Sequence, residues 1–200
     1  MASEYIERFS RTERAAHWVH ATAFLLLLAT GLVLYIPRLS VLIGRRPLLK
    51  DAHVYTAIGW IVALSLVVAL GDRRRLRATL AELDRFDDDD VHWLRAQSRP
   101  QGRFNAGQKV NTALTAAFAL LFAISGSLLW LGERDHSFRF ANTIALHDWL
   151  TLISLVLLAG HLFLALIYPA TRHALRGITV GTVRRDWAEQ HHAKWAREQQ

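Results

Sequence analysis

The sequence contains no cysteine. This absence excludes disulfide bonds, iron–sulfur clusters and cysteine-ligated zinc or haem within the chain. The features of a signal peptide are also missing, because the N-terminus opens on a charged stretch and no small-residue cleavage site follows its first apolar block. Any metal or redox chemistry in this chain must therefore use other ligands, and the sequence offers ten histidines.

Charged residues are nearly absent from four apolar blocks, although charges are frequent between them. Each block is 18 to 25 residues long, which is enough to cross a bilayer as a helix. Backbone groups inside lipid must be hydrogen-bonded within the segment, so helices are expected. The sequence therefore predicts an all-α membrane protein with a single domain, residues 1–200, and a bundle of four spanning helices at about 15–36, 53–70, 111–131 and 144–168.

Lysine and arginine are unevenly divided among the segments outside these blocks. The N-terminal segment, the loop at 71–109 and the C-terminal segment at 170–200 hold 18 of the 24, and the other two loops hold 6. The positive-inside rule predicts a multi-pass protein of a bacterial inner membrane, with both termini and the long loop in the cytoplasm. The end of the chain, from Arg184, is expected to form an amphipathic tail at the cytoplasmic surface. The net charge of +7 is then explained by the orientation of the chain in the membrane, and no nucleic-acid partner is expected.

Several polar residues of the cytoplasmic segments are expected to be ordinary surface residues. Acidic runs are most often solvated, so the run from Asp87 to Asp90 is expected to be exposed to solvent. The alternative interpretation is a divalent-metal site. His191 and His192 are expected at the surface, because adjacent helical positions do not share a face. Three further histidines lie in loops or beyond a helix end and are expected to have no special role: His92, His136 and His173.

Two histidines lie within the long apolar block between Asn142 and Pro169. His147 and His161 are fourteen residues apart, so on a helix their side chains are about 40° apart and about 21 Å apart along the axis. An imidazole inside a membrane helix is costly and is by default a functional-site hypothesis. Two imidazoles on one face at different depths indicate two cofactors stacked across the membrane.

The predicted topology sorts the histidines by depth. His53 and His147 lie near the periplasmic ends of their helices, whereas His161 lies toward the cytoplasm with either His17 or His20. Each level thus offers two neutral imidazoles, and bis-histidine ligation of one b-type haem per level fits this arrangement. His17 and His20 are three residues apart, and spacing alone does not choose between them.

Other interpretations of these histidines must be weighed. A single histidine at a helix end is more often an interfacial residue than a ligand, so the joint pattern carries the haem interpretation. A transporter that uses intramembrane histidines for Zn²⁺ or protons would be expected to have carboxylates within its helices, and Asp148 at a helix edge is the one such residue. Asp148 is expected either to be an interfacial charge or to tune the potential of the neighbouring haem.

Several motifs, spread over nearly the whole chain, resemble one known family. The first helix opens on Arg14 to Trp18 (RAAHW), the third is preceded by Arg103 to Lys109 (RFNAGQK), and the chain closes on RRDW and HHAKW. With the fourteen-residue spacing in the fourth helix, these motifs are similar to the gamma subunit, cytochrome b556, of membrane-bound respiratory formate dehydrogenase. In that family four helices hold two b haems, and the subunit passes electrons to a quinone.

The resemblance implies a ligand set for the two haems. The family's ligands fall on His53 and His147 at the periplasmic level and on His17 and His161 at the cytoplasmic level. The resemblance therefore favours His17 over His20.

The resemblance also implies a quinone site near the cytoplasmic haem, at Asn105, Gly107 and Gln108. Neutral amides at a water boundary offer hydrogen bonds to the quinone carbonyls, and protons are available there. The alternative from the residues themselves is that Asn105 caps the turn before the third helix while Gln108 is exposed to solvent.

The implied function is that of a quinone-reducing electron-transfer subunit with no substrate-oxidising site of its own. Electrons would come from an iron–sulfur beta subunit on the periplasmic side, supplied by a molybdenum- or tungsten-containing alpha subunit, and leave to menaquinone or ubiquinone. The complex could assemble into a higher oligomer. The nearest alternative is the same electron-transfer class serving another quinone-linked dehydrogenase, such as a hydrogenase.

Overall fold

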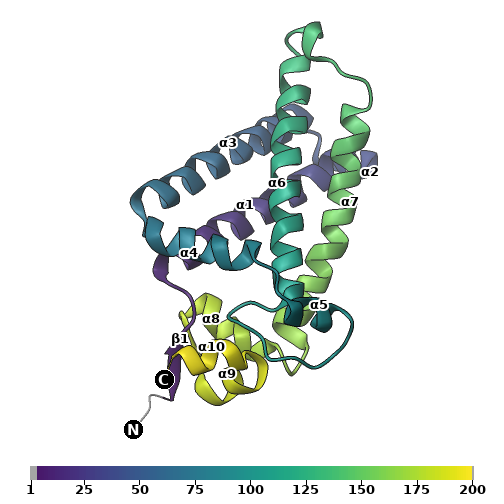
Figure 1. Cartoon of the computed structure of the whole chain (residues 1–200). Coiled ribbons are helices and arrows are strands. Elements are labelled where there is room, and N and C mark those ends of the chain that lie inside the picture. The colour runs from purple at the N-terminus through teal and green to yellow at the C-terminus, as the bar shows by residue number, and fades with distance from the viewer. Residues whose placement is uncertain (1–3, 200) are drawn as a thin grey trace. The chain divides into compact units, whose positions relative to one another are not determined.

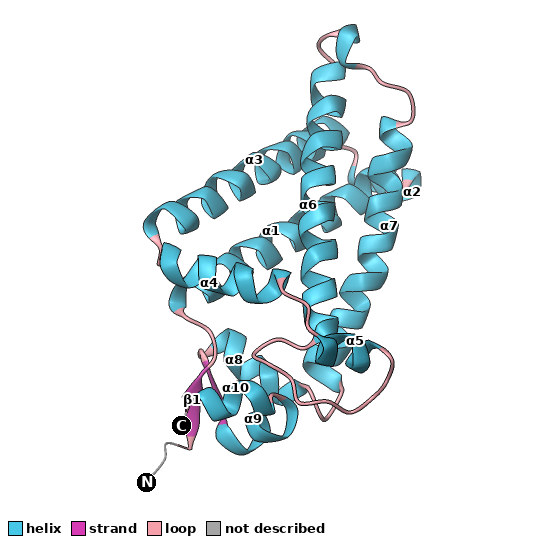
Figure 2. Cartoon of the chain, viewed as in Figure 1, coloured by secondary structure: helices cyan, strands magenta, loops and turns pink. Residues whose placement is uncertain are grey.

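The computed structural model describes residues 4–199, which form two compact units. The first unit combines the residues up to 14 with 72–117 and those from 159 onward, and the second combines 15–71 with 118–158. Figure 2 shows that helices make up most of the described chain, together with two short strands and the connecting loops.

Four long helices have the length and composition of membrane spans: α1 (Arg11–Tyr35), α3 (Arg46–Leu70), α6 (Ala106–Gly132) and α7 (Thr143–Leu162), the last continued by the π-helical η2 (Phe163–Ile167). At most 11% of the apolar window of any span is buried inside the protein. Apolar surface on this scale requires lipid or a cofactor against it. The prediction of an all-α membrane protein with four spanning helices is confirmed.

Three of the spans begin several residues earlier than the sequence predicted, and the first of them, α1, begins at Arg11 and not near Ala15. α3 begins at Arg46 and not near His53, and Pro47 is accommodated in its first turn, where a proline costs no helical hydrogen bond. α6 begins at Ala106 and not near Asn111. The loop that was predicted before α3 contains a further helix, α2 (Pro37–Ile43), which ends at Gly44 with a φ of 66°, a conformation that favours glycine.

The start of α1 is fixed by a reciprocal pair of hydrogen bonds. The Ser10 backbone N–H donates to Glu13 Oε2 (2.7 Å), and the Glu13 N–H donates to Ser10 Oγ (3.3 Å), which is a capping box. The second carboxylate oxygen of Glu13 accepts from Thr79 Oγ1 (2.6 Å) and from Arg103 Nη1 (2.9 Å). The N-terminal segment is thereby joined to the middle of the chain within the first unit.

The first unit also contains most of the short elements. Two helices lie in the predicted 71–109 loop, α4 (Arg73–Asp84) and α5 (Asp88–Leu94). The other short elements are η1 (His136–Phe138), in the second unit, and η3 (Arg172–Ala174), α8 (Leu175–Thr179), α9 (Arg185–His191) and α10 (Ala193–Glu198), in the first.

The buried core of the first unit joins the two ends of the chain. Strand β1 (Tyr5–Glu7) pairs antiparallel with β2 (Thr182–Arg184), with Ile6 opposite Val183. Figure 1 shows β1 beside the C-terminal helices of the same unit. These segments supply the core cluster, which consists of Ile6, Val183, Trp187, Ala188, Trp195 and Ala196. The C-terminal segment therefore packs through its apolar side chains against the N-terminal strand.

Candidate functional site

The predicted periplasmic-level pair, His53 on α3 and His147 on α7, is brought together within the second unit. Their ring centres are 6.4 Å apart, and the rings are inclined at 68°. The edge of Phe122, on α6, packs against the His147 ring at 5.1 Å between centres. Two helices far apart in the sequence, α3 and α7, therefore contribute one imidazole each to the pair, and α6 packs beside it.

A hydroxyl group on α1 orients the His53 ring. Thr30 Oγ1 donates to the Leu26 carbonyl (2.8 Å) and lies 2.8 Å from His53 Nδ1. Since the hydroxyl hydrogen is used by the helix carbonyl, the oxygen is left to accept a hydrogen bond from Nδ1–H. The neutral imidazole then carries its proton on Nδ1 and keeps the Nε2 lone pair available for a metal.

The same arrangement recurs around His147. Ser125, on α6, is completely buried; its Oγ donates to the Leu121 carbonyl (2.7 Å) and lies 2.9 Å from His147 Nδ1. The Nε2 lone pair of His147 is therefore also left available. A ligating imidazole in a metal site is usually oriented by a hydrogen bond to its other ring nitrogen.

A glycine follows each of these hydroxyl residues and leaves room for the ring. A Cβ at Gly31 would lie 3.4 Å from His53 Cε1, and a Cβ at Gly126 would lie 3.6 Å from His147 Cε1. The pairs Thr30-Gly31 and Ser125-Gly126 are thus equivalent, each facing a histidine on the following span. Sequence reasoning missed both hydroxyls; the available signal was a hydroxyl–glycine pair followed by a histidine after a similar interval in both halves of the chain.

The geometry of this pair fits axial ligation of a haem iron. A metal–imidazole bond is about 2.0 Å long, so two rings that share one ion have centres about 6 to 6.5 Å apart. The observed separation of 6.4 Å lies in this range. Both imidazoles have Nδ1 engaged, so each has Nε2 to offer to an iron, as a bis-histidine b haem requires.

The histidines of the cytoplasmic level fall in different units. His17 belongs to the second unit, where its ring meets the edge of Trp18 at 5.4 Å. His161 is exposed near the end of α7 and belongs to the first unit. The pairing of His17 with His161 therefore stays a prediction. His20 instead packs against Phe24 and Trp60, with centres 6.0 and 5.5 Å away.

The predicted quinone residues form the start of α6. Asn105 precedes the helix, and Gly107 and Gln108 lie in its first turn instead of before it. The Gln108 N–H donates to Asn105 Oδ1 (2.9 Å), and the Asn105 N–H donates to Gln108 Oε1 (3.1 Å). The two side chains thus form a reciprocal cap of the capping-box kind. Gly107 is required for a different reason, because a Cβ there would lie 3.0 Å from the Trp93 ring.

The cap uses the oxygen of each side-chain amide and leaves the NH₂ group outside the cap. Because both carbonyl oxygens face backbone N–H groups, both NH₂ groups point away from the cap. Within residues 4–199, neither NH₂ group donates a hydrogen bond. The cap and a ligand-binding role are therefore compatible: the oxygens hold the helix start, and two donors remain.

A buried arginine that the sequence did not single out lies beside this cap. Arg8 is only 2% exposed, and its Nη2 is within hydrogen-bond reach of the Arg103 carbonyl (2.8 Å) and, more weakly, Gln108 Oε1 (3.4 Å). Its Nε and Nη1 are buried without a partner among the described residues, and the guanidinium lies over the ring of Trp187. Burial, together with the charge of Arg103, lowers the pKa of Arg8 to about 9, and the group stays cationic at neutral pH.

His192 completes this network, and the prediction that it lies at the surface is wrong. Its side chain is 2% exposed, its Nδ1 lies 2.7 Å from the Gly102 carbonyl, and its Nε2 lies 3.1 Å from Arg8 Nη2. Nδ1–H therefore donates to the carbonyl while Nε2 accepts from the arginine. Burial and the charge of Arg8 lower the pKa of His192 to about 3. The helix ends at His191, and the break in direction turns His192 inward.

The acidic run is used in ion pairs and in a helix cap. Asp87 and Asp89 both pair with Lys194, and Asp90 pairs with Lys109. Asp87 also caps α5. No group of three or more potential metal-ligating side chains occurs within residues 4–199. These carboxylates hold α5 to α10 within the first unit.

Comparison with known proteins places these features in context. The family described as prokaryotic cytochrome b561 matches residues 8–181. The chain is 26% identical to the formate dehydrogenase cytochrome b556(fdo) subunit of Escherichia coli (strain K12), over 96% of this chain and 92% of that protein. It is 23% identical to the nitrate-inducible cytochrome b556(Fdn) subunit of the same strain, over 98% and 92%. A formate dehydrogenase cytochrome b556 subunit of Haemophilus influenzae is 21% identical, over 97% and 83%.

Proposed function

Because the chain belongs to the prokaryotic cytochrome b561 family, we propose that it is the cytochrome b membrane-anchor subunit of a formate dehydrogenase, passing electrons from a periplasmic-side iron–sulfur subunit to a quinone. The names of its relatives support the choice of formate dehydrogenase. The observation that carries the proposal is the His53–His147 pair, in which each imidazole is oriented by a hydroxyl so that Nε2 is available.

The proposed complement is two b haems, one held by His53 and His147 and the other by His17 and His161. Haem b supplies the one-electron iron couple that the protein's own side chains lack. Thr30 and Ser125 fix the imidazole tautomer at the periplasmic level.

The proposed quinone site lies at the cytoplasmic level, at the first turn of α6. Asn105 and Gln108 offer two NH₂ donors in fixed directions, suited to the carbonyl oxygens of menaquinone or ubiquinone, and Gly107, packed against Trp93, lies between them in the sequence. The buried Arg8 places a positive charge next to Gln108, which favours the negative charge that develops on a quinone oxygen during reduction. Protons taken from the cytoplasm would make turnover build a membrane potential.

The proposed topology places both termini and residues 71–109 in the cytoplasm of a bacterial inner membrane. The chain would then be the quinone-reducing subunit of a larger enzyme, whose iron–sulfur subunit and molybdenum- or tungsten-containing subunit carry out formate oxidation. The complex could form a higher oligomer.

The haem content of the purified protein tests this proposal. Two low-spin b haems per chain are expected from an absorption spectrum and a pyridine haemochrome assay. His53→Ala and His147→Ala should remove one and the same haem, His17→Ala and His161→Ala the other, and His20→Ala neither. A ratio near one would contradict the two-level pairing, and a ratio near zero would contradict the proposal as a whole.

The identity of the electron donor needs a separate experiment. Affinity purification of this chain from its own membranes should bring down the two partner subunits, and formate should reduce the haems of the isolated complex. Reduction by hydrogen and not by formate would identify a hydrogenase as the partner enzyme.

A further inference from the structure

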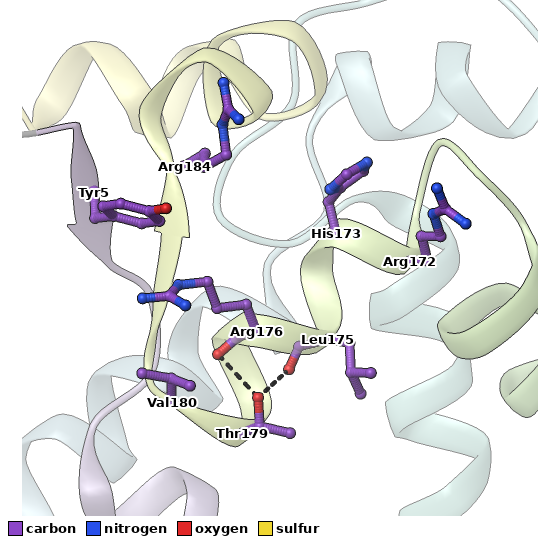
Figure 3. Close-up of a pocket in the computed structure, with 8 residues that line it drawn as sticks. All are labelled: Tyr5, Arg172, His173, Leu175, Arg176, Thr179, Val180 and Arg184. Carbon is purple, nitrogen blue, oxygen red and sulfur yellow. Dashed lines mark hydrogen bonds between the residues drawn. The ribbon is translucent and has the colours of Figure 1, made fainter.

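A pocket of about 380 Å³ lies in the first unit, where the chain leaves the fourth span. Figure 3 shows its lining side chains, which come from the first strand and from the segment between η3 and β2. They are Tyr5, Arg172, His173, Leu175, Arg176, Thr179, Val180 and Arg184. The volume lies within the range of small-ligand sites, roughly 300 to 1,000 Å³.

The polar lining is basic. Three arginines and one histidine line the pocket, and none of its lining residues is acidic. Arg184 pairs with Asp186 (3.0 Å from Nε to Oδ1). Arg172, His173 and Arg176 form no ion pair with any residue in the described part of the chain. The pocket therefore holds uncompensated positive charge, as a site for an anion would.

One of these arginines is already held in place. The Arg176 guanidinium lies over the Tyr5 ring, 4.4 Å from its centre, and Figure 3 shows the side chain reaching toward that ring. Stacking limits the freedom of the guanidinium without using its N–H groups. The Thr179 hydroxyl, in contrast, donates to the carbonyls of Leu175 and Arg176 and is used by its own helix.

The position of the pocket selects the kind of anion. The span that precedes it ends at Ile167, which is 64% exposed, and Tyr168 is 45% exposed. Tyrosines of this kind commonly mark the membrane–water interface. Leu175 and Val180 add apolar surface to the pocket wall, and Val180 is 52% exposed. A ligand with an anionic head and an apolar body fits this combination better than a soluble anion does.

We propose that this pocket binds the phosphate headgroup of an anionic membrane phospholipid at the end of the fourth span. The positive charges of Arg172 and Arg176 attract the headgroup, His173 and Arg184 belong to the same lining, and the acyl chains follow the apolar surface beside Ile167. Basic residues next to a membrane helix attract anionic lipid in this way. His173, for which the sequence predicted no special role, becomes part of a site.

Lipid retention by the intact purified complex tests the proposal. Delipidated complex is titrated with phosphatidylglycerol, cardiolipin and phosphatidylcholine, and bound lipid is counted by native mass spectrometry. The wild type should retain an anionic lipid in preference to phosphatidylcholine. Arg172→Gln combined with Arg176→Gln should weaken that binding roughly 20- to 30-fold, since each basic side chain near the surface contributes about a fivefold gain.

A matched charge control is available on α4. Arg74 and Arg77 are exposed arginines of the same unit that lie outside the pocket, and Arg74→Gln with Arg77→Gln removes the same charge. This control should retain the anionic lipid. An equal loss in both double variants would overturn the site, because general attraction of the basic surface would then explain the binding.

A single variant and a competition experiment complete the test. Arg172→Gln alone leaves the Arg176–Tyr5 stack intact and should weaken binding about fivefold, so the proposal can be tested even if the double variant does not fold. Inorganic phosphate is added as a competitor at 10 mM, a concentration of roughly that order being ample for a weak anion site. Displacement of the lipid by inorganic phosphate at that concentration would identify a soluble-anion site instead and overturn the lipid assignment.

Discussion

At the scale of single residues, the hydroxyls beside His53 and His147 have a role separate from ligation. Thr30 and Ser125 each use their own hydrogen for a helix carbonyl, which leaves the oxygen as an acceptor for an imidazole N–H. The two hydroxyls thereby set the tautomer of each imidazole before a ligand binds. This choice matters because a ring nitrogen can bind iron only when it carries no proton.

Replacing Thr30 by valine should weaken haem binding at the periplasmic level. The change keeps the shape of the side chain but removes the acceptor for His53 Nδ1, and loss of such a partner typically costs 10- to 100-fold in metal affinity. Ser125→Ala should act on the same haem through His147. Haem retention after dilution, followed by absorption, measures the effect. Thr56→Val is the control, because among residues 4–199 the Thr56 hydroxyl bonds only to Ala52 of its own helix, and loss of haem there would show that the effect is not specific.

His192 should make the first unit sensitive to acid. Its pKa is about 3 in the folded protein against an ordinary value of 6.5, so between these pH values the unfolded chain binds more protons. Stability is therefore complete above pH 6.5 and falls as the pH drops toward 3, with a slope of up to about 1.4 kcal/mol per pH unit.

This slope can be measured by denaturant unfolding followed through tryptophan fluorescence, because Trp187 and Trp195 lie in the core of that unit. His192→Gln should lower stability at pH 7 but flatten the slope between pH 6 and 4. His191→Gln, one residue away, should keep it. The same slope in all three proteins would assign the acid sensitivity to other groups.

At the scale of the element, the first turn of α6 has a structural role and, in the proposed function, a binding role as well. The oxygens of Asn105 and Gln108 cap the helix, whereas their NH₂ groups are free for a quinone. Ordinary alanine variants would remove both functions together. Serine keeps an oxygen acceptor suited to the N-cap and lacks the NH₂ donor, so it separates the two roles.

Asn105→Ser should therefore fold like the wild type but reoxidise its haems more slowly with quinone. Asn105→Ala should show the same kinetic defect and also lose about 1 kcal/mol of stability with the cap. Loss of one donor to a developing oxyanion typically slows a reaction by roughly 10²-fold, and less at a wet site. Stopped-flow reoxidation and thermal melting measure the two effects, and Asp89→Ala is the control away from the cap. Normal reoxidation in the serine variant would reduce Asn105 to a helix cap.

Some of these elements could be predicted from the sequence and others could not. Hydropathy located the four spans, because apolar length is a local property. The predicted topology, which sorts the histidines by depth, identified His53 and His147 as possible partners. The burial of Arg8 and His192 could not be predicted, because it depends on the pairing of β1 with β2, two short segments at opposite ends of the chain. The start of α6 was misplaced because polar residues capping a helix resemble a loop.

At the scale of the whole molecule, the arginine distribution predicts which segments face which compartment. A green fluorescent protein fused after residue 200 should fluoresce, because a cytoplasmic C-terminus lets it fold. Alkaline phosphatase inserted at Asp135, directly before η1, should be active, because the enzyme becomes active only in the periplasm. The opposite pattern would invert the topology and place the Asn105–Gln108 cap on the periplasmic side.

The pairing of β1 with β2 also has a consequence for how the protein is made. Tyr5–Glu7 leaves the ribosome first, yet its partner Thr182–Arg184 is among the last segments to be synthesised. At about 5 to 20 residues per second, the N-terminal strand waits roughly 10 to 35 s for its partner. Residues 15–71 and 118–158, which contain the His53–His147 pair, are all synthesised before β2. A chain truncated before Thr182 should accordingly still acquire the haem held by His53 and His147, while its N-terminus stays open to protease. The order of synthesis, and not only equilibrium stability, would then fix the order in which the two units mature.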